Sequence, residues 1–145
     1  MVAYVLDASA VLRFVDDEPG SERVEEILKA GISGSAQVSI SAVQWGEVAG
    51  RVRVHHGAQK EIAILNALLP IDVEIVPASA EQAVRAADLK VDRRISYADA
   101  FALELAMQSA ERVLVTADYG FKTVDDLAKI EFLPAKLEQG IGTRE

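Results

Sequence analysis

The feature that most constrains the fold is an apolar run at residues 3–6 that ends on Asp7 and changes at once into a helix-like pattern. The run does not alternate with polar residues, so it predicts a strand buried on both faces, as in a parallel sheet. Asp7 would then lie at the carboxyl end of that strand, where open α/β sheets bind their ligands. An aspartate directly before a helix is also a strong N-cap, so this position alone leaves a structural and a chemical role open.

Strand-like and helix-like segments alternate along the rest of the chain. Between the strand candidates lie segments with apolar residues at helical spacing, and each interval is long enough for a crossover between parallel strands. We therefore expect an α/β fold in which helices pack against a parallel sheet. Further strands are predicted at residues 38–40, 73–76, 113–115 and 130–133, the last at an edge of the sheet.

Composition narrows the class of protein. Half of the 145 residues are hydrophobic, which is enough for one domain over residues 1–145 with a substantial core. The chain has no cysteine, so disulfides and sulfur-ligated zinc are excluded, in agreement with a reducing compartment. No Lys or Arg precedes the N-terminal apolar run and no stretch approaches the length of a membrane span, so we expect a soluble cytoplasmic protein without a membrane partner.

The charge balance argues against a general attraction to nucleic acid. Asp and Glu number 23 against 15 Lys and Arg, for a formal net charge of -8. A polyanion would therefore need local help, either from divalent metal ions that reverse the sign of an acidic pocket or from clustered cations. The sequence contains two such clusters, namely Arg51, Arg53, His55 and Lys60, and Lys90, Arg93 and Arg94.

Glu47 is the second carboxylate of interest. It lies inside a helix that Ser41 and Gln44 open with the spacing of a capping box. Its alternative role is a surface ion pair with Arg51, four residues further on, worth about 0.3–0.5 kcal/mol. The sequence leaves both roles open.

Asp99 lies in the most apolar helix of the chain, predicted over residues 96–107, whose only other charged residue is Glu104. Such a helix is buried on most faces, so we expect Asp99 to be partly buried and to need a partner. Ser96 and Asp99 also have the spacing of a capping box, which would satisfy that need locally. Both interpretations fit the spacing.

Asp118 is the fourth carboxylate and follows the strand predicted at residues 113–115. In a parallel sheet it lies at the same edge as Asp7, although it could also be a simple turn residue. After it, the pattern predicts a loop over residues 120–122 and then a one-turn helix beginning near Thr123.

In a parallel sheet these acidic side chains converge. Carboxylates gathered without a neutralising Lys or Arg in the same motifs repel one another and raise each other's pKa. Divalent cations resolve the conflict, and oxygen-only ligands favour Mg²⁺ or Mn²⁺ with sites left for water and a phosphate oxygen. A divalent ion that binds both a water and a phosphate oxygen can hydrolyse phosphodiester bonds. The four converging acids are Asp7, Glu47, Asp99 and Asp118.

With these pieces in order, the chain resembles PIN-domain ribonucleases, and specifically the VapC toxins of toxin–antitoxin pairs. The resemblance implies a PIN-like three-layer α/β/α fold with a five-stranded parallel sheet, and a metal-dependent endoribonuclease that hydrolyses RNA phosphodiester bonds. It also implies a homodimer and a small cognate antitoxin that blocks the site. The matching segments are residues 5–10 (VLDASA), 17–20 (DEPG), 41–47 (SAVQWGE), 96–101 (SYADAF) and 115–118 (VTAD).

Carried over position by position, the resemblance assigns roles to individual residues. Asp7 and Asp99 would bind the main Mg²⁺ directly, with Mn²⁺ as an alternative ion. Glu47 and Asp118 would hold its waters or a second ion. Ser9 and Thr116 match positions at which the family has hydroxyl side chains. Their hydroxyls would hydrogen-bond to the metal ligands and orient them.

Two other functions fit part of the pattern. A haloacid-dehalogenase-like phosphatase would use Asp7 as its nucleophile, but it requires a second aspartate two residues on, where this chain has Ser9. A phosphorylated Asp7 would favour that enzyme. A non-catalytic interaction domain, whose acids are only caps and surface pairs, would bind no divalent ion.

Overall fold

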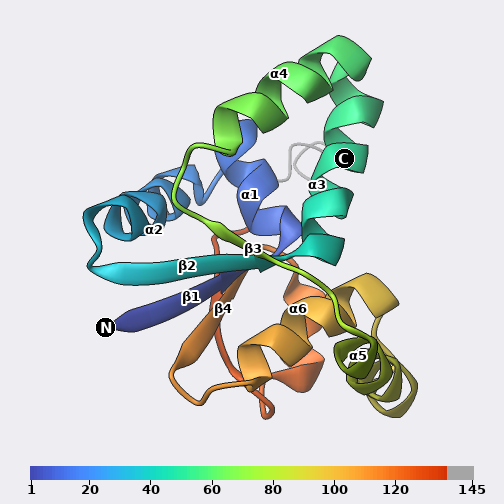
Figure 1. The fold of residues 1–145 in the computed structure, drawn as a ribbon. Helices are drawn as coiled ribbons and strands as arrows, with labels where there is room; N and C mark the ends of the chain where they lie inside the picture. Colours follow the sequence, from blue (N-terminus) through green and yellow to red (C-terminus); the bar gives the residue numbers. More distant parts are fainter. Residues whose placement is uncertain (137–145) are drawn as a thin grey trace, which may run out of the picture.

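The computed structural model describes residues 1–136, and in them the predicted parallel α/β architecture is confirmed. Five parallel strands form one sheet in the order β3-β2-β1-β4-β5, and helices cover both of its faces to give three layers (Figure 1). The strands are β1 (Val2–Leu6), β2 (Ala36–Ser41), β3 (Glu74–Val76), β4 (Arg112–Thr116) and β5 (Lys129–Phe132). The helices are α1 (Ala8–Val15), α2 (Ser21–Ser33), α3 (Ala42–His56), α4 (Ala58–Leu68), α5 (Ala80–Arg93), α6 (Tyr97–Met107) and the 3₁₀ helix η1 (Tyr119–Val124).

The central strand β1 is buried on both faces, which is why its sequence does not alternate. Leu6 packs with Val24 and Ile27 of α2 on one face. Val5 packs with Ala102 of α6 on the other. These side chains are at most 1% exposed, so truncating one of the larger ones to alanine should cost about 2–5 kcal/mol of folding free energy.

The strand order reverses at β1, which lies between β2 and β4. Leu6 is paired with Ile40 of β2 and with Val115 of β4, so the three strands reach the same edge of the sheet. Open α/β sheets bind ligands at such a switch point, outside the carboxyl ends of the strands. Asp7 follows β1 directly at that point.

The segment after β4 differs from the prediction of a loop over residues 120–122, which was wrong. The chain forms η1 there, and Asp118 caps it by accepting a hydrogen bond from the Gly120 backbone N–H at 2.8 Å. Phe121 and Val124 are three residues apart, which a 3₁₀ helix places on one side, and both are at most 1% exposed. Burial of this apolar pair explains why the segment is helical.

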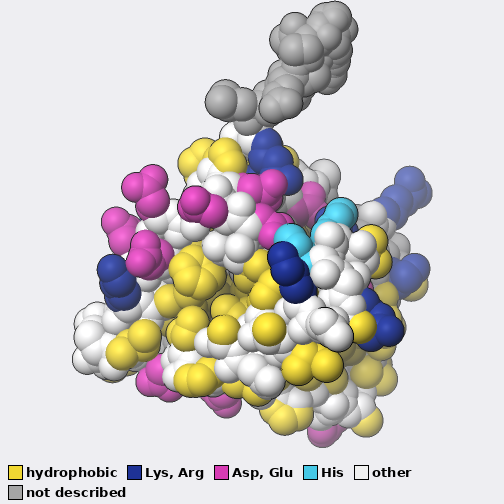
Figure 2. All heavy atoms as spheres, turned by 90° about the horizontal axis from the view of Figure 1, so that it is seen from above, with side chains coloured by type: hydrophobic (Ala, Val, Ile, Leu, Met, Phe, Trp, Pro, Cys, Tyr) yellow, Lys and Arg dark blue, Asp and Glu magenta, His cyan; other side chains and the backbone are white. Residues whose placement is uncertain are grey.

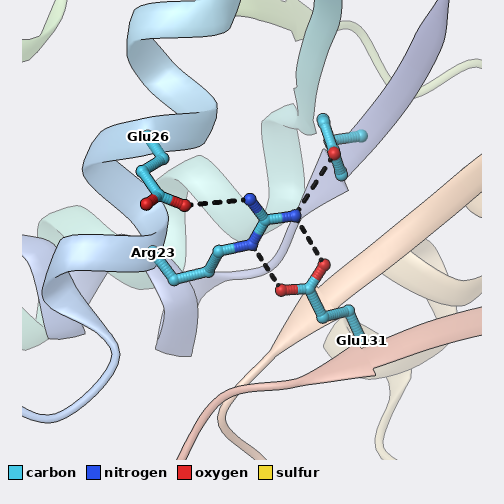
Figure 3. A network of polar contacts seen from close by, with 4 residues as sticks. Arg23, Glu26 and Glu131 are labelled. Atoms are coloured by element: carbon cyan, nitrogen blue, oxygen red, sulfur yellow. Dashed lines mark hydrogen bonds and ion pairs between the residues drawn. The ribbon is translucent and has the colours of Figure 1, made fainter.

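A charged network ties the edge strand β5 to α2 (Figure 3). Arg23 of α2 donates from Nε and Nη2 to the two carboxylate oxygens of Glu131, at 2.7 and 3.0 Å. Its Nη1 donates to Glu26 at 3.1 Å, and Nη2 also donates to the Tyr4 hydroxyl at 3.3 Å. Because the pair with Glu131 is bidentate, it fixes geometry as well as charge. The fold itself neutralises this acid.

Two predictions concern the chain as a whole. Within residues 1–136, no helix is both long enough and apolar enough to cross a membrane. The prediction of one domain over residues 1–145 includes residues 137–145, which lie outside the described part of the chain, and it stays a prediction.

Candidate active site

Asp7 occupies the turn from β1 into α1 and is 2% exposed. Its Oδ1 accepts hydrogen bonds from the Ala10 backbone N–H at 2.9 Å and from the Ser9 hydroxyl at 2.7 Å. Its Oδ2 accepts from the Thr116 hydroxyl at 2.5 Å. Asp7 is therefore the N-cap of α1, one of its two predicted roles. An ionised carboxylate has about four acceptor positions, so the cap leaves capacity for a ligand.

The hydroxyls of Ser9 and Thr116 join the two central strands behind this carboxylate. Their oxygen atoms lie 3.2 Å apart. Ser9 Oγ also accepts from the Ala117 backbone N–H at 2.8 Å, and Thr116 Oγ1 accepts from the Asp118 N–H at 2.9 Å. The turn after β4 is thereby pinned to the start of α1, which keeps Asp118 at the same cleft as Asp7.

Gln44 is a site residue that the sequence analysis missed. Its side chain is 2% exposed, and it accepts from the Ala8 backbone N–H at 2.7 Å and donates to the Ala98 carbonyl at 2.5 Å. It thus links the starts of α1, α3 and α6. The predicted capping box is only half formed, because Ser41 caps α3 while Gln44 is used elsewhere. The available signal was its position four residues before the buried Val48, on the apolar stripe of α3.

The four predicted acids line one cleft at the carboxyl edge of the sheet, with a volume of about 130 Å³. Asp7 is buried and Asp99, in the first turn of α6, is partly buried. Glu47 of α3 and Asp118, before η1, are exposed. The structure therefore brings all four acids together, although their roles remain predictions. Other side chains that line the cleft are those of Ser9, Gln44, Arg51 and Ser96.

Two of these acids hold protons more tightly than usual. Burial raises the pKa of Asp7 to about 6; its hydrogen-bond donors act in the opposite direction, and the charge of Asp99 adds to the rise. The pKa of Asp99 is raised by burial and then by the negative charges of Asp118 and Glu47, against a contact with Ser96 that lowers it. The acids therefore repel one another, and a cation bound among them would lower both pKa values.

Helix capping and a surface ion pair, the structural alternatives to metal binding, explain the positions of only some of the four acids. Ser96 caps α6 by accepting from the Asp99 backbone N–H at 3.1 Å, but among the described residues the Asp99 carboxylate does not return a bond to the Ser96 N–H. The predicted ion pair between Glu47 and Arg51 is also absent from the described part of α3 and its surroundings, so that alternative was wrong. Capping thus accounts for Asp7 and Asp118 but leaves two carboxylates without a cationic partner.

The donor set suits a hard divalent cation. All four acids offer carboxylate oxygen, the ligand preferred by Mg²⁺ and Mn²⁺. In the part of the chain that the structure describes, no three Asp, Glu or His side chains are arranged closely enough to enclose an ion as they stand. Mg²⁺ usually keeps several waters and needs only one or two carboxylates, so a cleft with this lining fits it.

Comparison with known proteins assigns the family. The chain belongs to the PIN domain family, whose profile matches residues 4–127. No curated protein sequence matches the chain at a significant level. This membership favours a nuclease over the haloacid-dehalogenase-like alternative.

Solved structures with the same fold include toxins and toxin–antitoxin complexes. VapBC2 from Rickettsia felis, bound to a DNA fragment from its promoter, matches with a TM-score of 0.69 at 18% identity over 91% of this chain and 99% of that chain. VapC20 from Mycobacterium tuberculosis, described as a sarcin–ricin loop cleaving toxin, matches with a TM-score of 0.67 at 16% identity over 83% and 94%. FitAcB from Neisseria gonorrhoeae matches with a TM-score of 0.65 at 22% identity over 88% and 96%. At these identities the likeness is one of fold.

Proposed function

We propose that this PIN domain is a metal-dependent endoribonuclease that hydrolyses RNA phosphodiester bonds, and that it is the toxin of a toxin–antitoxin pair. One observation carries the proposal. Four carboxylates from four separate places in the sequence line a single cleft at the switch point of the sheet, and within residues 1–136 none of them forms an ion pair. The fold thus maintains a repulsive arrangement that a divalent cation would relieve.

The proposal gives each acid a role. Asp7 and Asp99 would bind Mg²⁺ or Mn²⁺ directly, and Glu47 and Asp118 would hold its waters or a second ion. When bound, such an ion would supply a water of lowered pKa as the nucleophile and would offset the charge of the scissile phosphate.

The chain's own part is to hold these groups in place. The hydroxyls of Ser9 and Thr116 donate to different oxygens of Asp7, so they fix the orientation of its carboxylate. Gln44 fixes the backbone at the start of α1 and at the start of α6, and so sets the separation of Asp7 and Asp99. Groups that support a metal ligand in this way typically change metal affinity or activity by about 10–100-fold when they are removed.

An antitoxin partner is part of the proposal. Helices α1 to α4 surround an apolar pocket whose lining includes Phe14, Leu28, Trp45 and Leu69. Figure 2 looks onto this side of the molecule and shows apolar side chains in a hollow, with acidic groups on one side and histidine and basic groups on the other. An antitoxin would cover the apolar surface and place a basic side chain at the acidic cleft, since guanidinium binds carboxylates bidentately. Replacing every Arg and Lys of its contacting segment should then weaken inhibition.

Two further expectations stay predictions. The homodimer can be tested by sedimentation of the purified protein. The cytoplasmic location rests on the cysteine-free sequence.

The direct test of the proposal is RNA cleavage. The purified protein should cut single-stranded RNA in the presence of Mg²⁺ or Mn²⁺ and stop when EDTA removes the ion. Asp7→Asn, purified in the same way, controls for a contaminating nuclease. Cutting by Asp7→Asn at the wild-type rate would refute the assignment.

A further inference from the structure

Arg51 is the cationic side chain that lines the acidic cleft, where it lies with Glu47, Asp99 and Asp118. It is exposed, and within residues 1–136 it forms neither an ion pair nor a side-chain hydrogen bond. It follows Glu47 by four residues on α3, a spacing at which the two side chains are neighbours on the helix surface. Among the described residues, the side chains of Glu47 and Arg51 nevertheless form no ion pair with each other or with another residue.

Two other basic side chains at this end of α3 already have partners in the fold. Arg53 pairs with Glu61 of α4 at 3.2 Å, and His56 pairs with Asp16 at 3.1 Å. Residues two apart on a helix do not face the same side, so Arg53 does not share the position of Arg51. Arg51 therefore differs from its neighbours in lining the cleft without a partner.

An unpaired guanidinium beside four acids is suited to one kind of ligand. RNA brings several phosphates to the cleft, but a divalent ion offsets the charge of the reacting phosphate only. The next phosphate along a bound strand would approach the same carboxylates and would be repelled by them. Arg presents a rigid fork of donors that matches phosphate geometry bidentately, which makes it the side chain best suited to hold that second phosphate.

We propose that Arg51 binds the non-scissile phosphate next to the reacting one and so positions the RNA strand across the cleft. The inference rests on the proposed ribonuclease function and adds to it a contact with the substrate backbone. Because a phosphate contact carries no base information, Arg51 should support binding equally for different RNA sequences.

The test compares two substitutions that each remove one positive charge from the same helix, Arg51→Gln and Arg53→Gln. Binding of a short fluorescent single-stranded RNA is measured by anisotropy over a series of salt concentrations, in the Asp7→Asn background so that the RNA stays intact. Arg51→Gln should weaken binding by about tenfold, as expected for loss of a charge-assisted hydrogen-bonded pair. It should also lower the slope of log K against log salt by about 0.7, the value for one phosphate of a single strand. Arg53→Gln should leave both quantities close to those of its parent.

Cleavage by the otherwise wild-type enzyme gives a second readout. Arg51→Gln should raise KM more than it lowers kcat, and Arg51→Lys should restore the salt slope but only part of the affinity, because lysine keeps the charge without the fork. Thermal melts of the two Gln variants should match, which shows that neither effect comes from unfolding.

The possible outcomes separate the inference from the function on which it rests. If Arg51→Gln binds RNA with the affinity and salt slope of Arg53→Gln, the inference is wrong while cleavage by the wild type still supports the ribonuclease. If Arg51→Gln weakens only the complex with an antitoxin, Arg51 is a protein contact and the inference is also wrong. If the wild type neither binds nor cuts RNA, the proposed function itself fails.

Discussion

Helix α6 carries two carboxylates that the structure treats in opposite ways. Glu104, in the middle of the helix, is 5% exposed and accepts hydrogen bonds from Arg85 Nε at 2.6 Å and from Gln108 Nε2 at 2.8 Å. Asp99, in its first turn, is partly exposed and faces the negative charges of Asp118 and Glu47. Glu104 thus forms an ion pair with Arg85, whereas Asp99 forms none within residues 1–136.

We propose that this difference separates acids that stabilise the fold from acids that bind a ligand. A buried charge is tolerated when it is paired and hydrogen-bonded, as Glu104 is with Arg85. The partly exposed Glu131 is paired with Arg23 in the same way. An acid placed among other acids costs folding free energy in the absence of a cation. Such a cost is typical of a functional site, because the shifted pKa values and the repulsion persist only where the rest of the fold maintains them.

The largest expected effect is on catalysis, and it compares the two acids of α6 directly. Asp99→Asn should lower kcat/KM for RNA by about a thousandfold or more, since a metal ligand supports several kcal/mol of transition-state stabilisation. Glu104→Gln, which removes a charge from the same helix, should retain cleavage within about threefold of the wild type once corrected for the folded fraction. Single-turnover cleavage assays check both, and equal losses in the two variants would contradict the distinction.

The next effect is on the pH dependence of stability in EDTA. The pKa of Asp7 rises from 3.8 to about 6 on folding, so between these values the folded state binds the proton and the unfolded state does not. The contribution of Asp7 to stability should therefore fall as pH rises from about 4 to 6, by up to about 3 kcal/mol. Denaturant unfolding of wild type and Asp7→Asn across this range isolates the contribution as their difference. A difference that does not change with pH would contradict the raised pKa.

Paired acids should show the opposite sign in the same experiment. The pKa of Asp126 is lowered by its hydrogen bond and ion pair with Arg93. Its contribution is present above its unfolded pKa and is lost as pH falls through its folded pKa. Asp126→Asn should therefore lose less stability than the wild type when the pH is lowered. Asp7→Asn should lose less stability than the wild type when the pH is raised from about 4 to 6.

A smaller effect is expected when the support of Asp7 is removed. Thr116→Val keeps the shape of the side chain but deletes the hydroxyl that donates to Asp7 Oδ2 and accepts from the Asp118 backbone N–H. Metal affinity or kcat/KM should fall by about 10–100-fold. Titration with Mn²⁺ and cleavage assays measure these quantities, and Thr116→Ser, which retains the hydroxyl, is the matched control. If Thr116→Val behaves like Thr116→Ser, the hydroxyl does not support the ligand.

Much of the fold was predictable because the local patterns agree with the global arrangement. The unbroken apolar run before Asp7 requires a strand buried on both faces, and that strand is the centre of the sheet. Parallel strands end at one edge, so acids that follow β1 and β4 are necessarily close. The convergence of Asp7 and Asp118 follows from this rule.

The features that were not predicted depend on distant partners. Gln44 binds backbone groups 36 and 54 residues away, whereas the sequence offered it a local capping box. The pair between Glu47 and Arg51 was predicted from the spacing of neighbouring side chains on a helix. In the structure both side chains line the cleft and do not pair with each other. Likewise, burial of Phe121 and Val124 in the core explains η1. Helix propensity and residue spacing describe only residues that are near one another in the sequence. They therefore do not predict contacts between residues that are far apart in the sequence.

The central claim is that the cleft binds a divalent cation, since within residues 1–136 its four acids form no ion pair with a basic side chain. The most direct test of this claim is the sign of a stability change. Thermal melts of wild type, Asp99→Asn and Glu104→Gln are compared in EDTA and in Mn²⁺. In EDTA, Asp99→Asn should raise Tm because it removes one of the repelling charges, whereas Glu104→Gln should lower Tm because it breaks a buried pair with Arg85.

Mn²⁺ should then reverse the order of wild type and Asp99→Asn. Binding only to the folded state stabilises it by about 2.7 kcal/mol at a hundred times the dissociation constant, and a weakened site gains less at the same concentration. The wild type and Glu104→Gln should therefore show the same large rise in Tm with Mn²⁺, and Asp99→Asn a much smaller one. Equal Mn²⁺-induced shifts in all three proteins, with a lower Tm for Asp99→Asn in EDTA, would show that Asp99 is an ordinary helix residue and contradict the account.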